Sequence, residues 1–310
     1  MAAGLLRRDR MGAVKVRIGI ALGGYADAGR FAAAVDQLEQ LGVDSLWLQE
    51  MVFGAQVEPF IGTAHALSRT EHLKVGTAVA VLPGRHPVLV AKELASLAGL
   101  APGRVLPAFG LQPARLNERA VFPVPPGQRG AVFDESLELL RLMLREERVS
   151  FKGRYFSVDG ASVGPLPLKP LDIWTGGSAP GAFRRAGRLA DGWLGSFLTP
   201  QESRAAREAI QAAAAEAGRE IEGDHFGISL AVATGGIPDE VAATVRQRRP
   251  EADPAALIAD GWASARRMIE EYVAAGLTKF VVRPATASDT PGALEELLDR
   301  FAAEMLPLQN

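Results

Sequence analysis

The stretch IWTGGSAPGAFRRAGRLADGWLG (Ile173–Gly195) predicts a strand, a turn of two glycines and a serine, a helix and a second strand. A helix N-terminus leaves backbone N–H groups without partners and carries partial positive charge. Glycines ahead of it let the backbone approach an anion, and a serine hydroxyl adds a donor. Gly176, Gly177 and Ser178 therefore predict a phosphate site, with a tight turn in which Ser178 caps the helix as the structural alternative.

The same alternation of a short apolar run and a longer helical pattern extends along the whole chain. VRIGIALGG (Val16–Gly24) starts the series, and KFVVRP (Lys279–Pro284) with a helix over 291–305 ends it. We count eight strand–helix units, and several strands are apolar throughout, as expected when both faces of a sheet are buried. This count, and the absence of a GxGxxG turn after the first strand, favour an α/β fold of the (β/α)8 TIM barrel type over a doubly wound sheet.

Two connections are longer than ordinary loops. Leu111–Pro170, after the fourth strand, contains a predicted helix over 131–147 and the run RVSFKGRYFSV, which predicts a hairpin. Ile237–Trp262, after the seventh strand, is charged and contains prolines. Loops after barrel strands line the active face, so both insertions predict lids or walls of a substrate site.

The composition limits the class and the partners of the chain. Its 310 residues are 48% hydrophobic and carry a formal net charge of −2, which argues against nucleic acid or a membrane surface as a partner. No apolar run approaches the length of a membrane helix. No cysteine is present, which fits a reducing cytoplasm, and the four histidines lack metal-ligand spacing, so no metal is expected. We expect residues 1–13 to form a disordered tail and residues 14–310 a single domain.

Several stretches, in the same order along the chain, resemble the luciferase-like monooxygenase superfamily. They are the opening stretch, GVDSLWLQE, VGTAVAVLPGRHPVLVAKELASLAGLAPGRV and LNERAVFPVPPGQRGAVFDESLELLRLM. The resemblance is clear over Val16–Gly195, and the branch most similar is the set of oxidoreductases that use the deazaflavin coenzyme F-420. It implies a TIM barrel, a homodimer, and hydride transfer between the deazaflavin and a small organic substrate at the C-terminal face of the barrel.

The resemblance also assigns residues to the cofactor site. Gly176–Ser178 match the turn that approaches the cofactor phosphate, and Asn117 matches a polar position near the cofactor. Ala78 and Val79 match the pair that commonly forms a non-prolyl cis peptide behind the ring, although TAVAV alone predicts only a strand. Glu50 matches the acidic residue that closes the second strand and is the candidate catalytic carboxylate. A strand-end residue that bonds backbone N–H groups is the alternative interpretation of Glu50.

Two positions depart from the sugar-phosphate dehydrogenases of this branch. Those enzymes carry an aspartate and a histidine acid/base after the second strand, where this chain has Glu50 and Met51. They carry an acidic proton donor after the fourth strand, where this chain has Pro113. Methionine and proline cannot transfer protons. The sequence therefore argues against a sugar-phosphate dehydrogenase and favours reduction of an activated double bond, with a proton from solvent or from the insertions.

Two other functions are compatible with these residues. One is an FMN-dependent monooxygenase of the same superfamily, which would use reduced flavin and oxygen. The other is a non-catalytic barrel that only binds the cofactor, because both acid/base positions are changed. Oxygen consumption with reduced FMN would indicate the first, and tight cofactor binding without turnover would indicate the second.

Overall fold

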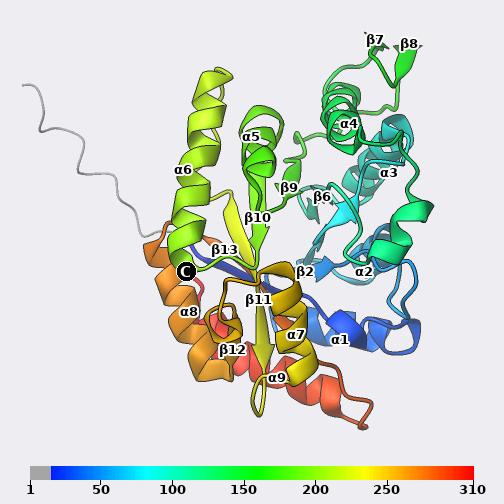
Figure 1. The fold of residues 1–310 in the computed structure, drawn as a ribbon. Coiled ribbons are helices and arrows are strands. Elements are labelled where there is room, and N and C mark those ends of the chain that lie inside the picture. The colour runs from blue at the N-terminus through cyan, green and yellow to red at the C-terminus, as the bar shows by residue number, and fades with distance from the viewer. Residues whose placement is uncertain (1–14) are drawn as a thin grey trace, which may run out of the picture.

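Eight parallel strands alternate with eight covering helices in residues 15–310, the part of the chain that the computed structural model describes (Figure 1). The barrel strands are β1 (Arg17–Ile20), β2 (Ser45–Leu48), β3 (Lys74–Thr77) continued by β4 (Ala80–Val81), β5 (Val105–Leu106) continued by β6 (Ala108–Gly110), β9 (Trp174–Gly176), β10 (Gly192–Ser196), β11 (Phe226–Ala233) and β13 (Lys279–Pro284). The helices are α1 (Ala28–Gln40), α2 (Pro59–Arg69), α3 (Pro87–Leu100), α4 (Arg129–Met143), α5 (Pro180–Leu189), α6 (Pro200–Glu216), α8 (Trp262–Ala274) and α9 (Ala293–Met305). The predicted tail at residues 1–13 lies outside the described residues.

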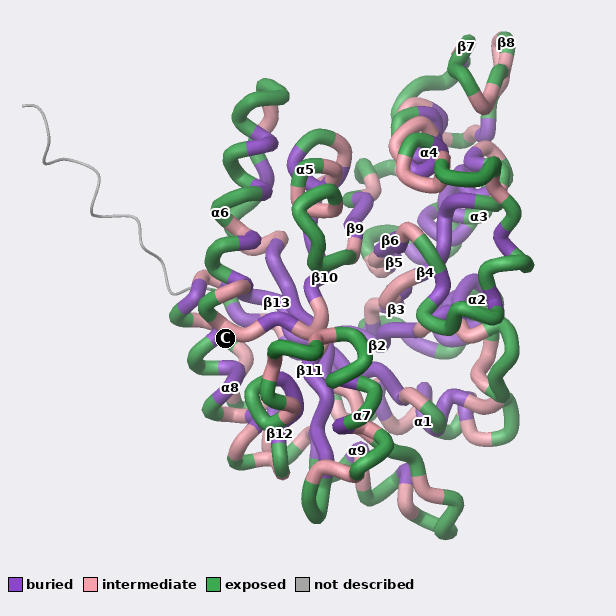
Figure 2. Tube along the Cα trace, in the orientation of Figure 1, coloured by how far each residue is buried: buried purple, intermediate pink, exposed green. Residues whose placement is uncertain are grey.

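Strand pairing closes this sheet into a barrel. The hydrogen-bonded order is β4-β6-β9-β10-β11-β13-β1-β2-β3-β5. Because β3 and β4 are consecutive halves of one strand, as are β5 and β6, the parallel pairs β3–β5 and β4–β6 join the two ends of this order. Figure 2 shows that the strands are largely buried and that the outer sides of the helices are exposed. The predicted TIM barrel is confirmed, and the doubly wound sheet, which would stay open, is excluded.

The insertion after β6 contains the predicted hairpin. After η2 (Leu116–Val121) and α4, the strands β7 (Val149–Lys152) and β8 (Ser157–Ala161) pair antiparallel to each other and join no other strand. Figure 1 shows this hairpin projecting beyond α4 at the top of the molecule. The predicted helix begins and ends earlier than expected, at Arg129 and Met143.

The insertion after β11 adds a strand that the sequence does not predict. It contains α7 (Asp239–Arg248), η3 (Pro254–Ala256) and β12 (Ile258–Asp260), and β12 pairs with the end of β11. Three residues are too few to show a periodic pattern, so β12 has no signal in the sequence. The first strand is also shorter than predicted, because the chain turns into η1 (Gly23–Tyr25) soon after β1.

The barrel interior is a packed core. Trp47, Trp174 and Leu194 are 1%, 5% and 4% exposed and pack together inside it, and Ala78 and Val79 lie against this cluster. In a barrel filled by side chains, the loops at the C-terminal end of the strands are the place for a ligand site. No helix within residues 15–310 has the length and hydropathy needed to cross a membrane.

Glu39, the next-to-last residue of α1, holds the loop before β3 at the N-terminal end of the barrel. Its carboxylate accepts hydrogen bonds from the backbone N–H groups of Glu71, His72 and Leu73, at 2.9, 2.9 and 2.8 Å. Partial burial raises the pKa of this carboxyl, but the three backbone N–H groups outweigh burial and lower the pKa to about 2.

We expect Glu39→Gln to lose a pH-dependent share of the stability. A carboxyl with a lowered pKa in the folded state stabilises the protein above its unfolded pKa and stops doing so as the pH falls through the folded value. The difference in unfolding free energy between the wild type and Glu39→Gln should therefore be full above pH 4.5 and vanish near pH 2. Denaturant unfolding across this range measures the difference, and a pH-independent difference would contradict the role given to these bonds.

Candidate functional site

The Gly-Gly-Ser turn lies at the C-terminal end of β9, where the barrel opens. Gly177 has a φ of +119°, and a Cβ built on it would lie 2.7 Å from the Cβ of Ala182, so the turn requires glycine. Trp193 Nε1 donates a 2.9 Å hydrogen bond to the Gly177 carbonyl and fixes the turn from behind. Ser178 does not cap α5, because the N-cap is Ala179 and it has no side-chain hydrogen bond. The structural alternative for Ser178 is therefore wrong.

This geometry leaves polar groups of the turn open to solvent. Ser178 and Ala179 are exposed, and within residues 15–310 neither backbone N–H donates a hydrogen bond. Pro180 follows as the first residue of α5, where its missing N–H costs nothing. Free N–H groups ahead of a helix N-terminus favour an anion, so the turn fits the phosphate of a cofactor.

Ala78 and Val79 lie beside this turn. The peptide bond between them is cis, as the resemblance implies. A Cβ built on Gly110 of β6 would lie 2.5 Å from Val79 Cγ2, and one built on Gly176 would lie 3.0 Å from Val79 Cγ1. Val79 therefore fills the space left by two glycines, and the structure brings it into contact with the predicted phosphate turn.

Glu50 follows β2 at the same end of the barrel and is 5% exposed. Its carboxylate accepts a 2.6 Å hydrogen bond from the N–H of Val81 and forms an ion pair with Arg85, whose guanidinium lies over the ring of Phe60. Burial raises the pKa of this carboxyl, although the Val81 N–H and Arg85 both favour its ionised form. These contacts agree with the alternative interpretation of Glu50 as a strand-end residue that bonds backbone N–H groups. Its cofactor contact stays a prediction.

Asn117 lies in η2, in the insertion after β6. It is exposed, and its side chain forms no hydrogen bond with any residue of 15–310, so its cofactor contact also stays a prediction. The neighbouring Glu118 is 0% exposed. Met51 is partly exposed and Pro113 is buried. Neither side chain can titrate, so the two changed acid/base positions place no titratable group at the open C-terminal end of the barrel, which we call the mouth.

A cationic wall at the mouth is the part of the site that the sequence interpretation missed. Arg283, near the end of β13, is partly buried and forms no ion pair within the described part of the chain. Its guanidinium lies 5.9 Å from the ring centroid of Phe197, a residue with φ +55° that follows β10. Arg248 of α7 lies over the same ring at 5.1 Å and has no acidic partner among residues 15–310. Burial, and the charge of Arg248, lower the pKa of Arg283 to about 10.

The only sequence signal for this wall is an arginine after the apolar residues of the run KFVVRP. A guanidinium without a carboxylate partner is suited to hold a carboxylate or a phosphate of a ligand. The mouth therefore has two possible binding sites for an anionic group. One is the Gly-Gly-Ser turn after β9, and the other is the cationic wall formed by residues of β13, α7 and the end of β10.

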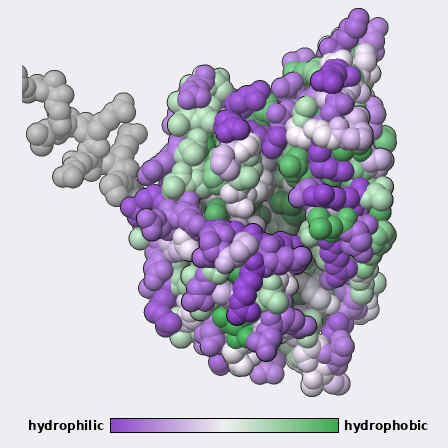
Figure 3. Space-filling model, in the orientation of Figure 1, coloured by the Kyte–Doolittle hydropathy of each residue, from purple (hydrophilic) through white to green (hydrophobic). Residues whose placement is uncertain are grey.

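The mouth is hollowed between these elements. Figure 3 shows a recess between the side formed by α5 and the side formed by α2 and α3, with hydrophobic residues at its border. A small cavity at the ends of β1 and β2 is lined by apolar and amide side chains, among them Leu22, Trp47, Gln49 and Gln56. An apolar recess with a few polar groups is typical of a site for a small organic molecule.

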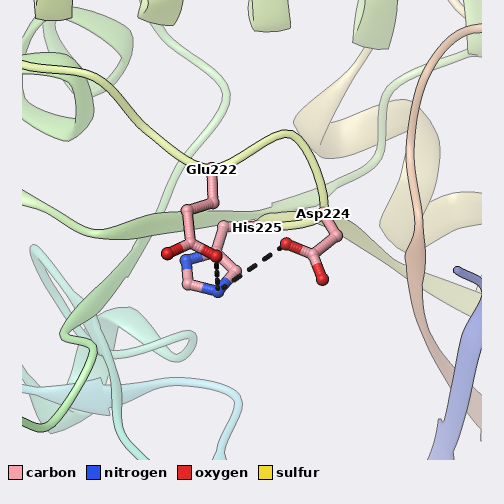
Figure 4. Close-up of side chains that lie close together, drawn as sticks. All are labelled: Glu222, Asp224 and His225. Carbon is pink, nitrogen blue, oxygen red and sulfur yellow. Dashed lines mark ion pairs between the residues drawn. The ribbon is translucent and has the colours of Figure 1, made fainter. Parts of the chain in front are cut away.

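Outside the mouth, three titratable side chains lie close together before β11, at the opposite end of the barrel (Figure 4). Glu222, Asp224 and His225 hold potential metal ligands within 4.8 Å of one another, although the sequence predicts no metal site. His225 Nδ1 lies 2.8 Å from the carbonyl oxygen of Asp191, so this nitrogen carries the proton. Nε2 lies 3.8 and 4.0 Å from carboxylates of Glu222 and Asp224, too far for hydrogen bonds.

The fold and the mouth together define a (β/α)8 barrel with an exposed Gly-Gly-Ser turn at its C-terminal face. The model of the luciferase-like monooxygenase family matches residues 12–303 of the chain. The chain belongs to this family.

Two curated relatives show how far the similarity extends. A stretch of 175 residues is 31% identical to a protein of Kineococcus radiotolerans named F420-dependent glucose-6-phosphate dehydrogenase, covering 54% of this chain and 52% of that protein. A stretch of 146 residues is 35% identical to an uncharacterized protein of Mycobacterium tuberculosis, covering 47% of this chain and 50% of that protein. The chain therefore matches about half the length of these relatives.

Solved structures match the whole barrel. An F420-dependent secondary alcohol dehydrogenase, in complex with an F420–acetone adduct, has a TM-score of 0.78 at 18% identity and covers 96% of this chain and 100% of that chain. The oxygenating constituent of 3,6-diketocamphane monooxygenase from Pseudomonas putida, in complex with FMN, has a TM-score of 0.72 at 17% identity and covers 96% and 99%. At these identities the likeness shows the fold alone.

Proposed function

We propose that this protein is an oxidoreductase that transfers a hydride between the deazaflavin coenzyme F-420 and a small organic substrate at the barrel mouth. The observation that carries the proposal is the turn at Gly177, whose exposed and unbonded N–H groups at Ser178 and Ala179 suit a phosphate. The relatives named F420-dependent glucose-6-phosphate dehydrogenase support the choice of deazaflavin over FMN.

The residues of the mouth would divide the work of holding the cofactor. The turn Gly176–Ser178 would hold the phosphate, Ala78 and Val79 would support one face of the ring, and Asn117 and Glu50 would lie at its edge. When bound, the deazaflavin supplies the hydride chemistry. The protein orients the ring, shields it from water and binds the substrate on the exposed face.

The substrate would carry a negatively charged group. Arg283 and Arg248 lack acidic partners within residues 15–310, and both lie over the ring of Phe197 at the mouth. An anionic group placed between them would relieve their mutual repulsion and accept charge-assisted hydrogen bonds. With Met51 and Pro113 at the former acid/base positions, the proton for the reaction would come from solvent or from the insertions.

Titration of the purified protein with the deazaflavin and with FMN tests this function. We expect quenching of deazaflavin fluorescence with a dissociation constant in the micromolar range or below, and weaker FMN binding. Oxygen consumption with reduced FMN would instead support the luciferase-like monooxygenase alternative. Tight deazaflavin binding without turnover of any hydride acceptor would support a non-catalytic barrel.

We also propose a homodimer formed through an apolar surface beside the mouth. Ile61 near the start of α2 and Leu89 near the start of α3 are 67% and 65% exposed, and the two helices pack together. Large exposed apolar side chains on neighbouring helices are typical of a protein interface.

The dimer predicts a mass of twice 32.9 kDa in solution and its loss in the variant Ile61→Glu. A charge at this position would be buried without a partner in the dimer. Sedimentation velocity measures the mass of each variant. Leu100→Glu is the matched control, because Leu100 is 82% exposed at the other end of α3 and should leave the dimer intact. A monomeric wild type, or a dimer in Ile61→Glu, would contradict the proposed interface.

A cytoplasmic location is part of the proposal. The cysteine-free sequence is compatible with a reducing compartment. Fractionation of cells that express the native protein, followed by immunodetection, would test the location.

A further inference from the structure

Glu118 joins two loops of the mouth. It lies in η2, is 0% exposed, and its Oε1 accepts a 2.9 Å hydrogen bond from the backbone N–H of Phe53 in the connection between β2 and α2. Arg115, at the start of η2, donates from Nη1 to the backbone carbonyl of Phe53 at 2.9 Å. Both polar backbone groups of Phe53 are therefore held by the insertion after β6, and we call this set the Phe53 clamp.

The buried carboxylate of the Phe53 clamp lowers the stability of the folded state more than a purely structural contact would need to. Glu118 Oε2 is buried and has no hydrogen-bond partner within residues 15–310, and the nearest cation, Arg115 Nη1, is 3.9 Å from Oε1. A buried carboxylate with one unpartnered oxygen destabilises the folded state, and an apolar side chain of similar size would be better tolerated. Groups that cost stability in this way are concentrated at functional sites.

The two loops that the clamp joins both carry predicted site residues. Asn117 directly precedes Glu118 in η2, while Glu50 and Met51 lead into Phe53 from the end of β2. The far end of η2 is fixed separately, because Arg129 donates a 2.8 Å hydrogen bond to the carbonyl of Phe122, the residue after η2. The position of the near end, and of Asn117, therefore depends on the clamp.

We propose that Glu118 is a positioning residue that sets the distance between Asn117 and the end of β2, and with it the width of the mouth over the bound cofactor ring. This inference rests on the proposed function. Oε1 is the atom that accepts the hydrogen bond from Phe53. Glutamine at this position has the same acceptor and should keep the two loops in place, whereas alanine should not.

The experiment compares Glu118→Ala and Glu118→Gln with the wild type in two measurements. The first is the dissociation constant for the deazaflavin, and the second is hydrogen exchange in the peptide that contains Phe53, measured without cofactor. Glu118→Ala should weaken cofactor binding about tenfold or more and speed exchange at Phe53, while Glu118→Gln stays within about threefold of the wild type.

Glu39→Ala is the matched control. Glu39 also fastens a loop through backbone N–H groups, but at the opposite end of the barrel. Its loss should lower stability and leave both cofactor binding and exchange at Phe53 unchanged. Equal cofactor loss in Glu39→Ala and Glu118→Ala would show that Glu118 acts only through stability and would overturn the inference.

The other possible results also test the positioning role of Glu118. Unchanged cofactor binding in Glu118→Ala, or the same loss in Glu118→Gln as in Glu118→Ala, would overturn the positioning role. If the wild type binds no deazaflavin, the proposed function fails first. Exchange at Phe53 then decides the clamp by itself, because unchanged exchange in Glu118→Ala would overturn it and faster exchange would support it.

Discussion

Replacing Arg283 with methionine is expected to stabilise the protein and to weaken binding of an anionic substrate. Arg283 is partly buried at the mouth, has no acidic partner within residues 15–310, and faces the like charge of Arg248. Removing a partly buried and unpaired charge should raise the free energy of unfolding by about 1 kcal/mol. The same change removes a charge-assisted hydrogen bond to the ligand, which should weaken anion binding about tenfold to a hundredfold.

Two measurements test the expected gain in stability and the expected loss of anion binding. Differential scanning calorimetry gives the change in stability, and isothermal titration with inorganic phosphate, with the cofactor present, gives the change in anion binding. Arg246→Met is the matched control, because Arg246 is exposed on α7, the helix that also carries Arg248, and makes no ion pair within residues 15–310. A less stable Arg283→Met variant that binds the anion as the wild type does would contradict the assignment.

The barrel was predictable from the sequence because each unit carries its own signals. The apolar runs of the strands, Pro87 at the first position of α3, and Gly42 after α1 are local features, and each unit could be identified without its neighbours. Eight such units allow few parallel arrangements, so the count, with the absence of a GxGxxG turn after the first strand, favoured a closed barrel. By contrast β12 has only three residues and is a strand only because β11 extends past its pairing with β10, which ends at Ser229.

The site was predictable only where its residues are close in the sequence. The turn at Gly177 combines glycine, serine and a following helix within a few residues, so its backbone geometry has a local cause. The cis bond after Ala78 has no such cause, and only the resemblance to the family pointed to it.

The cationic wall depends instead on barrel closure. Phe197, Arg248 and Arg283 come from three separate units of the chain, and their spacing in the sequence contains no sign that they meet. Glu118 illustrates the same limit, since a glutamate in a polar loop gives no indication that it is fully buried.

The variant Gly177→Ala is expected to weaken cofactor binding strongly while the barrel still folds. The φ of +119° at Gly177 is disfavoured for any residue with a side chain, and the new Cβ would lie 2.7 Å from the Cβ of Ala182. Strain of this kind costs about 1–3 kcal/mol and can be relieved only if the turn moves away from α5. A turn displaced by about 1 Å would no longer present the N–H groups of Ser178 and Ala179 to one phosphate, so the affinity should fall about a hundredfold.

Gly181→Ala separates this effect from a general response of the turn to alanine. Gly181 is exposed in the first turn of α5, and the nearest atom to its new Cβ would be the end of the Arg184 side chain at 3.9 Å. Alanine there should leave the affinity unchanged and raise the helix stability by about 0.5–1 kcal/mol, because alanine favours the helix over glycine. Fluorescence titration with the deazaflavin and with FMN measures both variants. Equal affinity in Gly177→Ala and the wild type would show that the phosphate lies elsewhere, and the cofactor would then have to be placed against the cationic wall of Arg248 and Arg283.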